Sequence, residues 1–393
     1  MTLSPHAALL LVLPLLASDV AGGTPDTPTR PIRWGIMGCG GISSDFVGAL
    51  KGLSPEEGVV VACGARKLDD AKRFAESLGV ERWHEGYENL ANDPDVDVIY
   101  VGTVAQAHVA CARIALAANK PVLVEKPLAM CASDAAALVR EAKERNLFLM
   151  EGMWTRAFPA VRRARELIAS GAIGDVVTVA ADFGWPATAL DGEHRRCIDP
   201  VSGGVSMDVA MYPIAHVLLA TGAAKPTRIV ATGTTKPAAV AAAAEVGGDD
   251  EGTPSKPAVV DWSVGAALSG FPGRPALSAT LLCTLDASTP EEAVYTGTKG
   301  TLRIHRSAHT PTKLTLSTAV GRDLVDEVLD FPLPPIPPGA RPFNYPGSQG
   351  FVYEARAVHA ALREGRLEAD EWTHEESVTT QAIIDEVRAA VIA

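Results

Sequence analysis

The sequence has no dense run of lysine or arginine. Its 35 basic residues are outnumbered by 47 acidic ones, and the formal net charge at pH 7 is −12. Proteins that bind nucleic acid or an anionic membrane surface need clustered cations. The charge pattern therefore argues against both classes of partner.

Cysteines are few, and they form no metal-binding or disulfide pattern. There is no CxxC pair and no cysteine–histidine cluster, and most of the cysteines stand in apolar or helical surroundings. The six lie at positions 39, 63, 111, 131, 197 and 283. We therefore expect reduced, packed thiols, no disulfide framework and no metal site.

No apolar run is long enough to predict a stable membrane span. The run AALLLVLPLLA, at residues 7–17, is too short and is interrupted by Pro14. It has the length of a signal peptide, but no lysine or arginine precedes it. Two interpretations stay open for residues 1–30: a cleaved targeting segment with a linker, or a loose apolar extension. The localisation is accordingly cytoplasmic, or secretory or organellar if residues 7–17 act as a signal, and we expect folded chain from Pro31.

Length and composition are those of a folded protein with two domains. The chain has 393 residues, of which 47% are hydrophobic and 21% are charged. Between residues 31 and 153, apolar strands alternate with helices. Strands are predicted at the start of 32–50 and at 59–66, 96–103, 121–127 and 147–154, and helices at 67–79, 107–120 and 133–146. This alternation predicts an α/β domain with a doubly wound parallel sheet.

Residues 154–393 show a different pattern, in which a run of strands follows a run of helices. This order predicts an α+β domain with a large, mainly antiparallel sheet. Residues 203–222 are predicted as one long helix, and residues 331–342 as an extended proline-rich connection. Residues 236–258, rich in alanine, glycine and proline, are predicted as a disordered surface insertion. The sequence has no repeat architecture.

The sequence GCGGIS at residues 38–43 stands between the first predicted strand and the first helix. In a dinucleotide-binding turn of the form GxGxxG, Gly38 would make the tight turn and Gly40 would let a pyrophosphate approach the backbone. Ser43 replaces the third glycine but is small. The context favours dinucleotide binding over a glycine turn without a ligand.

The second predicted strand ends with CGAR, at residues 63–66. No carboxylate is present there to hold the ribose 2′-hydroxyl of NAD. The guanidinium of Arg66 can instead bind a 2′-phosphate, although Arg66 and Lys67 can also be explained as solvated residues at a helix start. A cation at a helix N-terminus is disfavoured by the helix dipole, which weakens the second explanation. We therefore favour NADP(H).

A lysine follows the strand PVLVE and precedes a proline. Lys126 is expected at the carboxyl edge of the parallel sheet, where ligands of such sheets bind. The alternative is an ion pair with Glu125. On the predicted helix 203–222, Asp208 and Tyr212 lie one turn apart. Tyr212 is either a core tyrosine or an acid/base group whose pKa the Lys126 ammonium lowers.

These motifs together resemble one family over residues 31–393. RWGIMGCGGISSDF, VACGAR, ALAANKPVLVEKPLA, LFLMEGMWTRAFPA, GGVSMDVAMYPI and YTGTKGTLRI are similar to stretches of the glucose–fructose oxidoreductase / inositol dehydrogenase (Gfo/Idh/MocA) family. Within that family the chain most resembles the dihydrodiol dehydrogenase / NADP-dependent D-xylose dehydrogenase branch. Ser43, AANK in place of AAGK, and the insertion depart from the family pattern.

The resemblance implies a role for each matching residue. Catalysis would rest on Lys126 and Tyr212, with Asp208 in support. Cofactor contacts are implied at Gly38, Gly40, Gly41, Ile42, Arg66, Thr103, Ala105, His108, Glu125, Lys126, Trp154 and Arg156. Substrate contacts are implied at Lys126, Trp154, Phe183, Asp208 and Tyr212. The resemblance also implies a homodimer formed through the C-terminal sheet.

The expected activity is that of an NADP-dependent dehydrogenase acting on CH–OH groups. The substrate would be an aldopyranose, with D-xylose giving xylonolactone, or a cyclic trans-dihydrodiol. Two alternatives remain: a related reductase of another sugar or keto sugar, and a catalytically silent NADP(H)-binding sensor. A sensor needs neither Lys126 nor Tyr212, so their presence favours an enzyme.

Overall fold

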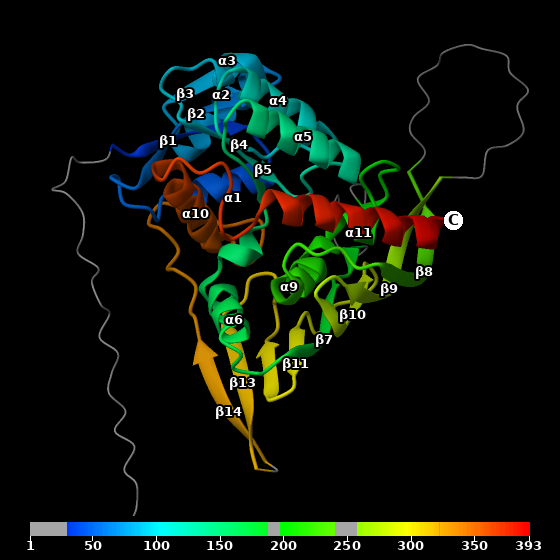
Figure 1. Ribbon diagram of the computed structural model, residues 1–393. Helices are drawn as coiled ribbons and strands as arrows, with labels where there is room; N and C mark the ends of the chain where they lie inside the picture. The colour runs from blue at the N-terminus through cyan, green and yellow to red at the C-terminus, as the bar shows by residue number, and fades with distance from the viewer. Residues whose placement is uncertain (1–29, 188–196, 240–257, 322) are drawn as a thin grey trace, which may run out of the picture. The chain divides into compact units, whose positions relative to one another are not determined.

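The computed structural model describes residues 30–187, 197–239, 258–321 and 323–393 (Figure 1). The predicted targeting segment lies outside these residues, as does most of the predicted insertion at 236–258. Residues 31–393 form one unit that contains two sheets.

The first sheet is parallel and has the order β3-β2-β1-β4-β5-β6, which confirms the predicted doubly wound arrangement. Its strands are β1 Ile32–Met37, β2 Gly58–Ala65, β3 Arg82–Glu85, β4 Val98–Val101, β5 Val122–Glu125 and β6 Leu149–Gly152. The helices between them are α1 Gly41–Leu50, α2 Leu68–Leu78, α3 Tyr87–Ala91, α4 His108–Ala117 and α5 Ala132–Glu144. The order reverses between β1 and β4, so the ligand site is expected at the carboxyl ends of these two strands.

The second sheet has the order β14-β13-β12-β11-β7-β10-β9-β8 and is antiparallel except between β7 and β10. This confirms the predicted mainly antiparallel sheet. Its strands are β7 Val176–Gly184, β8 Arg228–Pro237, β9 Val259–Phe271, β10 Arg274–Thr284, β11 Ala293–Gly297, β12 Gly300–Ile304, β13 Lys313–Val320 and β14 Asp323–Asp330.

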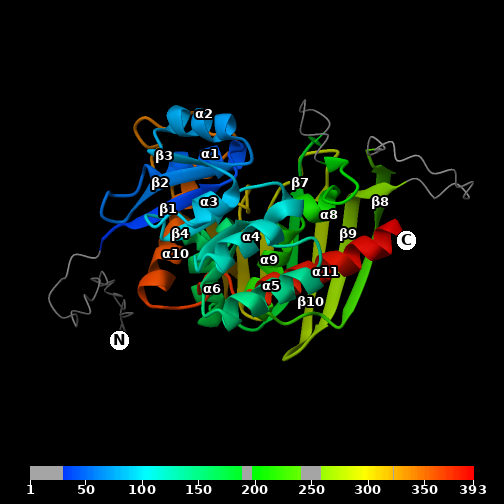
Figure 2. The same ribbon diagram turned by 90° about the horizontal axis from the view of Figure 1, so that it is seen from above.

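Helices cover one face of this second sheet. They are α6 Pro159–Ala169, α8 Val205–Asp208, α9 Met211–Thr221 and α11 His374–Ile392. Helix α10 Phe351–Arg363 lies against α1 of the parallel sheet instead. Helix α9 lies against β7 and β10, and α11 runs from α5 to β8 and β9 (Figures 1 and 2). All residues of α9 except Thr221 are buried. The two sheets therefore share a continuous core, and the N-terminal end of α9 faces the parallel sheet through the side chains described below.

The predicted helix 203–222 is wrong, because the structure divides it into α8 and α9. Pro213 has no N–H to donate to the carbonyl of Val209, and its ring would clash with that carbonyl in a continuous helix. Pro213 instead occupies the first turn of α9, where proline is tolerated. The N–H of Tyr212 donates to the Val209 carbonyl oxygen at 3.1 Å.

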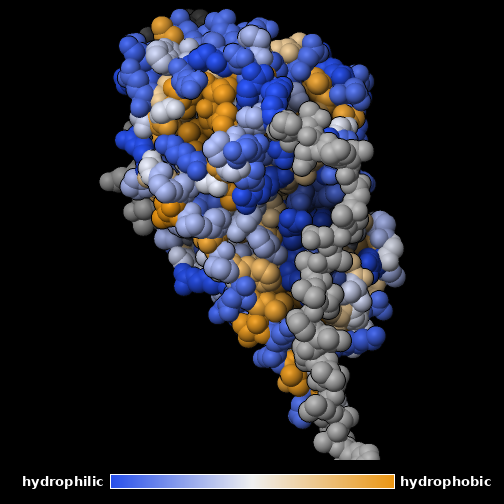
Figure 3. Space-filling view, turned by 90° about the vertical axis from the view of Figure 1, so that its left-hand side faces the viewer, coloured by the Kyte–Doolittle hydropathy of each residue, from blue (hydrophilic) through white to orange (hydrophobic). Residues whose placement is uncertain are grey.

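Three strands were missed by the sequence analysis, β3, β11 and β14. Of these, β3 and β14 lie at sheet edges. In β14 every residue except Leu329 is exposed. Figure 3 shows apolar atoms mixed with hydrophilic ones toward the lower end of the molecule, where the β13–β14 hairpin lies. Exposed apolar side chains of this hairpin are Val320, Leu324, Val325 and Val328.

Candidate active site

The turn after β1 has the backbone that a dinucleotide site needs. Gly38 has a φ of +99°, and a Cβ there would lie 2.9 Å from both the carbonyl oxygen of Gly102 and Cγ2 of Thr103. A Cβ on Gly40, in contrast, would meet no atom within 4 Å. Space for a ligand is therefore open on the side of Gly40.

Gly40 is the N-cap of α1, and no acidic side chain stands in the first turn of this helix. The N–H groups at the start of α1 are therefore suited to an anion, as a bound pyrophosphate requires. Gly41 and Ile42 begin the helix. The residues of the turn thus fit the diphosphate of a dinucleotide.

Ser43 keeps the close packing that the third glycine usually provides. Its hydroxyl donates to the carbonyl oxygen of Gly102 at 3.3 Å. A Cβ on Gly102 would lie 2.3 Å from that hydroxyl. Gly102, which follows β4, has no side chain and therefore leaves the space that Ser43 occupies in place of the third glycine of the motif.

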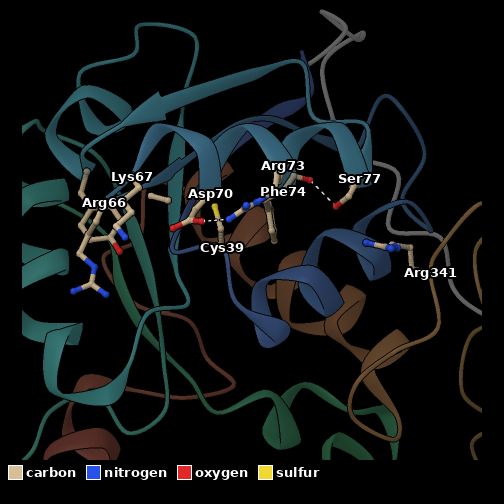
Figure 4. A pocket seen from close by; sticks show the side chains of 10 residues that line it. Cys39, Arg66, Lys67, Asp70, Arg73, Phe74, Ser77 and Arg341 are labelled. Atoms are coloured by element: carbon tan, nitrogen blue, oxygen red, sulfur yellow. Dashed lines mark hydrogen bonds and ion pairs between the residues drawn. The ribbon is translucent and has the colours of Figure 1, made fainter.

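A cavity of about 590 Å³ lies next to this turn, along α2 (Figure 4). It is lined by Cys39, Ala65, Arg66, Lys67, Asp70, Arg73, Phe74, Ser77, Tyr87 and Arg341. The four cations outnumber the single carboxylate, which forms an ion pair with Arg73. The excess of positive charge suits a phosphorylated ligand. Arg66 lies in this cavity, where a 2′-phosphate was predicted.

Lys126 follows β5 and extends toward the helices of the second sheet. Its Nζ donates to the main-chain carbonyl oxygen of Asp208 at 2.8 Å and lies 5.2 Å from the ring centroid of Tyr212. In an unbroken helix this carbonyl would accept from the N–H of Tyr212. Because that N–H donates to Val209 instead, the Asp208 carbonyl is available to the lysine.

Tyr212 is held by aromatic neighbours from three segments. The indole Nε1 of Trp154 donates to the hydroxyl oxygen of Tyr212 at 3.2 Å, and the Trp154 ring stacks on Phe351 with centroids 4.5 Å apart. The ring of Phe183 lies 5.3 Å from that of Tyr212. The structure thus brings Lys126, Trp154, Phe183, Asp208 and Tyr212 together.

Two residues of this group were missed by the sequence analysis. The His309 ring stacks on Phe183 at 4.7 Å and lies 5.7 Å from the Tyr212 ring. The indole Nε1 of Trp185 donates to Oδ2 of Asp208 at 3.0 Å. His309 stands in a loop between β12 and β13, where no local pattern marks it. Trp185 directly follows β7, and a tryptophan at the end of a predicted strand was a sequence signal that could have identified it.

The pKa of Tyr212 in the free protein is raised, whereas the sequence analysis predicted a lowered pKa. Burial raises the pKa of Tyr212 well above its ordinary value, and the charge of Glu125 raises it further. The hydrogen bond from Trp154 acts in the opposite direction and lowers this pKa. Tyr212 is therefore a protonated phenol at neutral pH, and Trp154 is the neighbour that favours its phenolate.

Three buried carboxyl groups lie behind Lys126. Oε1 of Glu125 accepts from the hydroxyl of Tyr100 at 2.8 Å, and burial raises the Glu125 pKa to about 7. Glu151 accepts from two donors, the N–H of Leu128 and the indole of Trp372, each at 2.9 Å. Among the described residues, Glu354 has no hydrogen-bond partner for either oxygen, and burial raises its pKa well above its ordinary value. Burial therefore favours the neutral carboxylic acid form of Glu354.

The loop after β4 contains three of the predicted cofactor residues. The ring nitrogens of His108 lie 2.8 Å from the carbonyl oxygen of Pro127 and 3.1 Å from that of Thr103. Ala105 begins a single 3₁₀ turn, Ala105–Ala107. His108 is buried and joins this loop to the residues after Lys126, so its observed role is to position the backbone.

The side chain of Arg156 binds α9 and α11. It is 5% exposed, and its guanidinium donates to Oε1 of Glu376 at 2.7 Å and to the carbonyl oxygen of Ala215 at 2.9 Å. A buried guanidinium needs such partners, because an unpaired buried charge is strongly unfavourable. This ion pair joins η2 Trp154–Ala157 to α11 and does not support the predicted cofactor contact.

Known proteins are similar to this chain along most of its length. The matching families are described as "Oxidoreductase family, NAD-binding Rossmann fold", over residues 32–153, and "GFO/IDH/MocA C-terminal domain", over residues 161–303. Trans-1,2-dihydrobenzene-1,2-diol dehydrogenases of Bos taurus and Homo sapiens are each 34% identical, over 92% of this chain and 97% of each relative. A solved structure of a 3-ketoreductase from Actinomadura kijaniata in complex with NADP and TDP-benzene matches with a TM-score of 0.70 at 26% identity, covering 92% of this chain and 98% of that one. No helix in the described part of the chain is long and apolar enough to cross a membrane.

Proposed function

Because the chain belongs to the Gfo/Idh/MocA oxidoreductase family, we propose that it uses NADP⁺ to oxidise a hydroxyl-bearing ring carbon of an aldopyranose or a cyclic trans-dihydrodiol. D-Xylose is the sugar that we propose to test first. The observation that carries this proposal is the approach of Lys126, from the parallel sheet, to Asp208 and Tyr212, from the helices on the second sheet.

The cofactor would be held by the turn at Gly38 to Ile42 and by the cavity that Arg66 lines. The relatives named above are dihydrodiol dehydrogenases, and the similar 3-ketoreductase structure contains NADP. The basic lining of the cavity supports NADP over NAD, because an arginine can bind the additional 2′-phosphate through two parallel hydrogen bonds. Thr103, Ala105 and Trp154 would complete the binding residues.

The side chains at the site would manage the proton of the substrate hydroxyl. When bound, NADP⁺ supplies the hydride acceptor and a positive charge. In the oxidation, Tyr212 would first release its own proton to solvent and would then, as the phenolate, take the hydroxyl proton; in the reduction, its phenol would donate a proton to the reacting oxygen. Trp154 would stabilise the phenolate through its indole N–H, and Lys126 would stabilise negative charge on the reacting oxygen. Asp208 and Phe183 would orient the ring of the substrate.

The open face of the second sheet supports a homodimer. One row across the strands consists mostly of small or apolar residues. The row is Val230, Ala267, Thr280, Ala180, Val294, Arg303, Thr315 and Val328. Leu282 stands beside it and is 51% exposed. Two such faces can stack. Light scattering should give a dimer for the parent and a monomer for Leu282→Arg, and a monomeric parent would remove the proposal.

The activity is tested with a substrate panel. We would incubate the protein with NADP⁺ or NAD⁺ and with D-xylose, D-glucose, trans-1,2-dihydrobenzene-1,2-diol or cyclohexanol, and follow the absorbance of the reduced nicotinamide. We expect turnover with NADP⁺ and with substrates that carry adjacent ring hydroxyls, but not with cyclohexanol. Binding of NADP⁺ without turnover of any panel member would instead favour a silent sensor or a reductase of another sugar.

A further inference from the structure

His309 is a polar ring in the aromatic group around Tyr212. The centroid of its imidazole lies 4.7 Å from that of Phe183, 5.7 Å from that of Tyr212 and 6.3 Å from that of Trp154. A ring substrate whose reacting oxygen meets the hydroxyl of Tyr212 would therefore lie beside this imidazole.

The backbone that carries His309 is fixed, although it belongs to a loop. The hydroxyl of Thr155 donates to the carbonyl oxygen of His309 at 2.6 Å. Nε2 of His216 lies 3.0 Å from the carbonyl oxygen of Ala308, and the N–H of Ala308 donates to the carbonyl oxygen of Glu291 at 2.9 Å. Contacts from three segments thus hold the imidazole in place, as a substrate-binding side chain requires.

Glu291 is held in a rare backbone conformation next to this imidazole. Its φ is +55°, in the left-handed region that residues other than glycine seldom adopt. The carboxylate of Asp182, on β7, maintains this conformation by accepting from the N–H of Glu291 at 2.7 Å and from that of Glu292 at 3.1 Å. Oε2 of Glu291 lies 3.4 Å from Nδ1 of His309, and both side chains are mostly buried. Such strain is typical of residues with a function, and here it brings a carboxylate to one nitrogen of the ring.

The carboxylate gives the two ring nitrogens different surroundings. A negative charge beside Nδ1 favours a proton on that nitrogen and leaves Nε2 for another partner. Among the described residues, none forms a hydrogen bond with either ring nitrogen of His309. A polar ring in an aromatic group thus has hydrogen-bonding capacity that the described part of the protein does not use.

We infer that His309, oriented by Glu291, binds the hydroxyl group next to the reacting carbon of the substrate. This inference rests on the proposed oxidation of a ring hydroxyl at Tyr212. The oxygens of two adjacent ring hydroxyls lie close together, so the groups that bind them must be neighbours, as Tyr212 and His309 are. A substrate without the second hydroxyl would leave the imidazole without a partner, and the site would discriminate against it.

The test compares D-xylose with 2-deoxy-D-xylose, which lacks only the hydroxyl next to the anomeric carbon. Steady-state kinetics at saturating NADP⁺ would give kcat/KM for both sugars. His309→Phe keeps an aromatic ring beside Phe183 but has no ring nitrogen. For this variant we expect kcat/KM to fall about 10- to 50-fold with D-xylose and less than about threefold with the deoxy sugar. The preference of the parent for D-xylose should therefore be lost.

Three further variants separate recognition from packing. Glu291→Asn removes the charge but keeps a residue type that tolerates positive φ, and it should lower kcat/KM selectively with D-xylose, by about 3- to 10-fold. His309→Gln, with an amide that can pair with a hydroxyl, should recover part of the preference that His309→Phe loses. His305→Phe is the matched control, because it makes the same substitution in the same loop at a histidine that contacts Thr315 on β13. It should distinguish the two sugars as the parent does.

Equal losses with both sugars in His309→Phe, or no loss with either, would overturn the inference and leave the proposed oxidation intact. If His309→Phe does not fold, Glu291→Asn provides the same comparison, and equal effects on the two sugars would again overturn it. A selective effect of His309→Phe with none of Glu291→Asn would overturn the orienting role of Glu291. A parent that oxidises neither sugar would instead overturn the proposed sugar oxidation, and the present inference with it.

Discussion

Glu125 should make the stability of the protein depend on pH between 4.5 and about 7. Its pKa is raised from 4.5 to about 7, mainly by burial. A carboxyl group with a raised pKa stabilises the fold below its unfolded value, and this contribution is lost as the pH rises through the folded value. The unfolded chain releases the proton first, at pH values where the folded protein still retains it. Ionised Glu125 therefore opposes folding above pH 7.

The size of the effect follows from the two pKa values. The interval from 4.5 to about 7 corresponds to about 3 kcal/mol of unfolding free energy. Glu125→Gln keeps an oxygen that can accept from the hydroxyl of Tyr100 but cannot ionise. Relative to the parent, this variant should gain about 3 kcal/mol between pH 4.5 and pH 8.5.

The measurement is urea-induced unfolding, followed by tryptophan fluorescence in a series of buffers across this pH range. Glu144→Gln serves as the matched control, because Glu144 is an exposed residue of α5 and the substitution changes the charge equally. A stability difference between Glu125→Gln and the parent that stays constant across the series would refute the argument. It would mean that the buried carboxyl group titrates as it does in the unfolded chain.

Three further predictions concern the site. Tyr212→Phe should lower kcat by about 10²- to 10⁴-fold, and Lys126→Met by at least as much, with the double variant far from additive; additive losses in steady-state kinetics would contradict a joint role. Trp154→Phe keeps the stacking on Phe351 but loses the hydrogen bond to Tyr212, so kcat for oxidation should fall about 5- to 10-fold and the ascending limb of its pH–rate profile should move to higher pH. An unchanged ascending limb would assign Trp154 to packing alone. Glu354→Gln should be more stabilising at pH 8 than at pH 5, because the Glu354 carboxyl is held neutral in the fold; equal effects in urea unfolding would disprove this.

The parallel sheet and its glycine turn could be predicted because their signals are local. Apolar strands alternate with helices, and the backbone demands at Gly38 and Gly40 are visible within six residues. The edge strand β14 could not be predicted in this way, because four of its eight residues are acidic and its side chains are exposed. The contact between Asn344 and Asp45 is separated by 299 residues in sequence, and only the tertiary fold brings Arg341 to the cavity.

Glu354 shows a signal that the sequence carried and that was not used. Phe351, Glu354, Ala355 and Val358 recur at helical spacing, and all are buried on one face of α10. An acid at a position that the periodicity assigns to the core indicates a buried carboxyl group, since a solvated acid belongs on the opposite face. Such a residue needs a proton or a cation, and after burial the charges of Glu125 and Glu151 raise the Glu354 pKa further and so favour the proton.

Pro213 links the sequence to the geometry of the reacting groups. As a proline in the middle of the predicted helix 203–222, it requires a helix start or a break near Val209. The break leaves the Asp208 carbonyl available on the side of the parallel sheet, and the Lys126 ammonium donates to it at 2.8 Å. Pro213, whose side chain has no reactive group, thus determines where the ammonium of Lys126 is held. The spacing of Asp208, Tyr212 and Pro213 consequently predicts more about this site than the identity of Asp208 or Tyr212 alone.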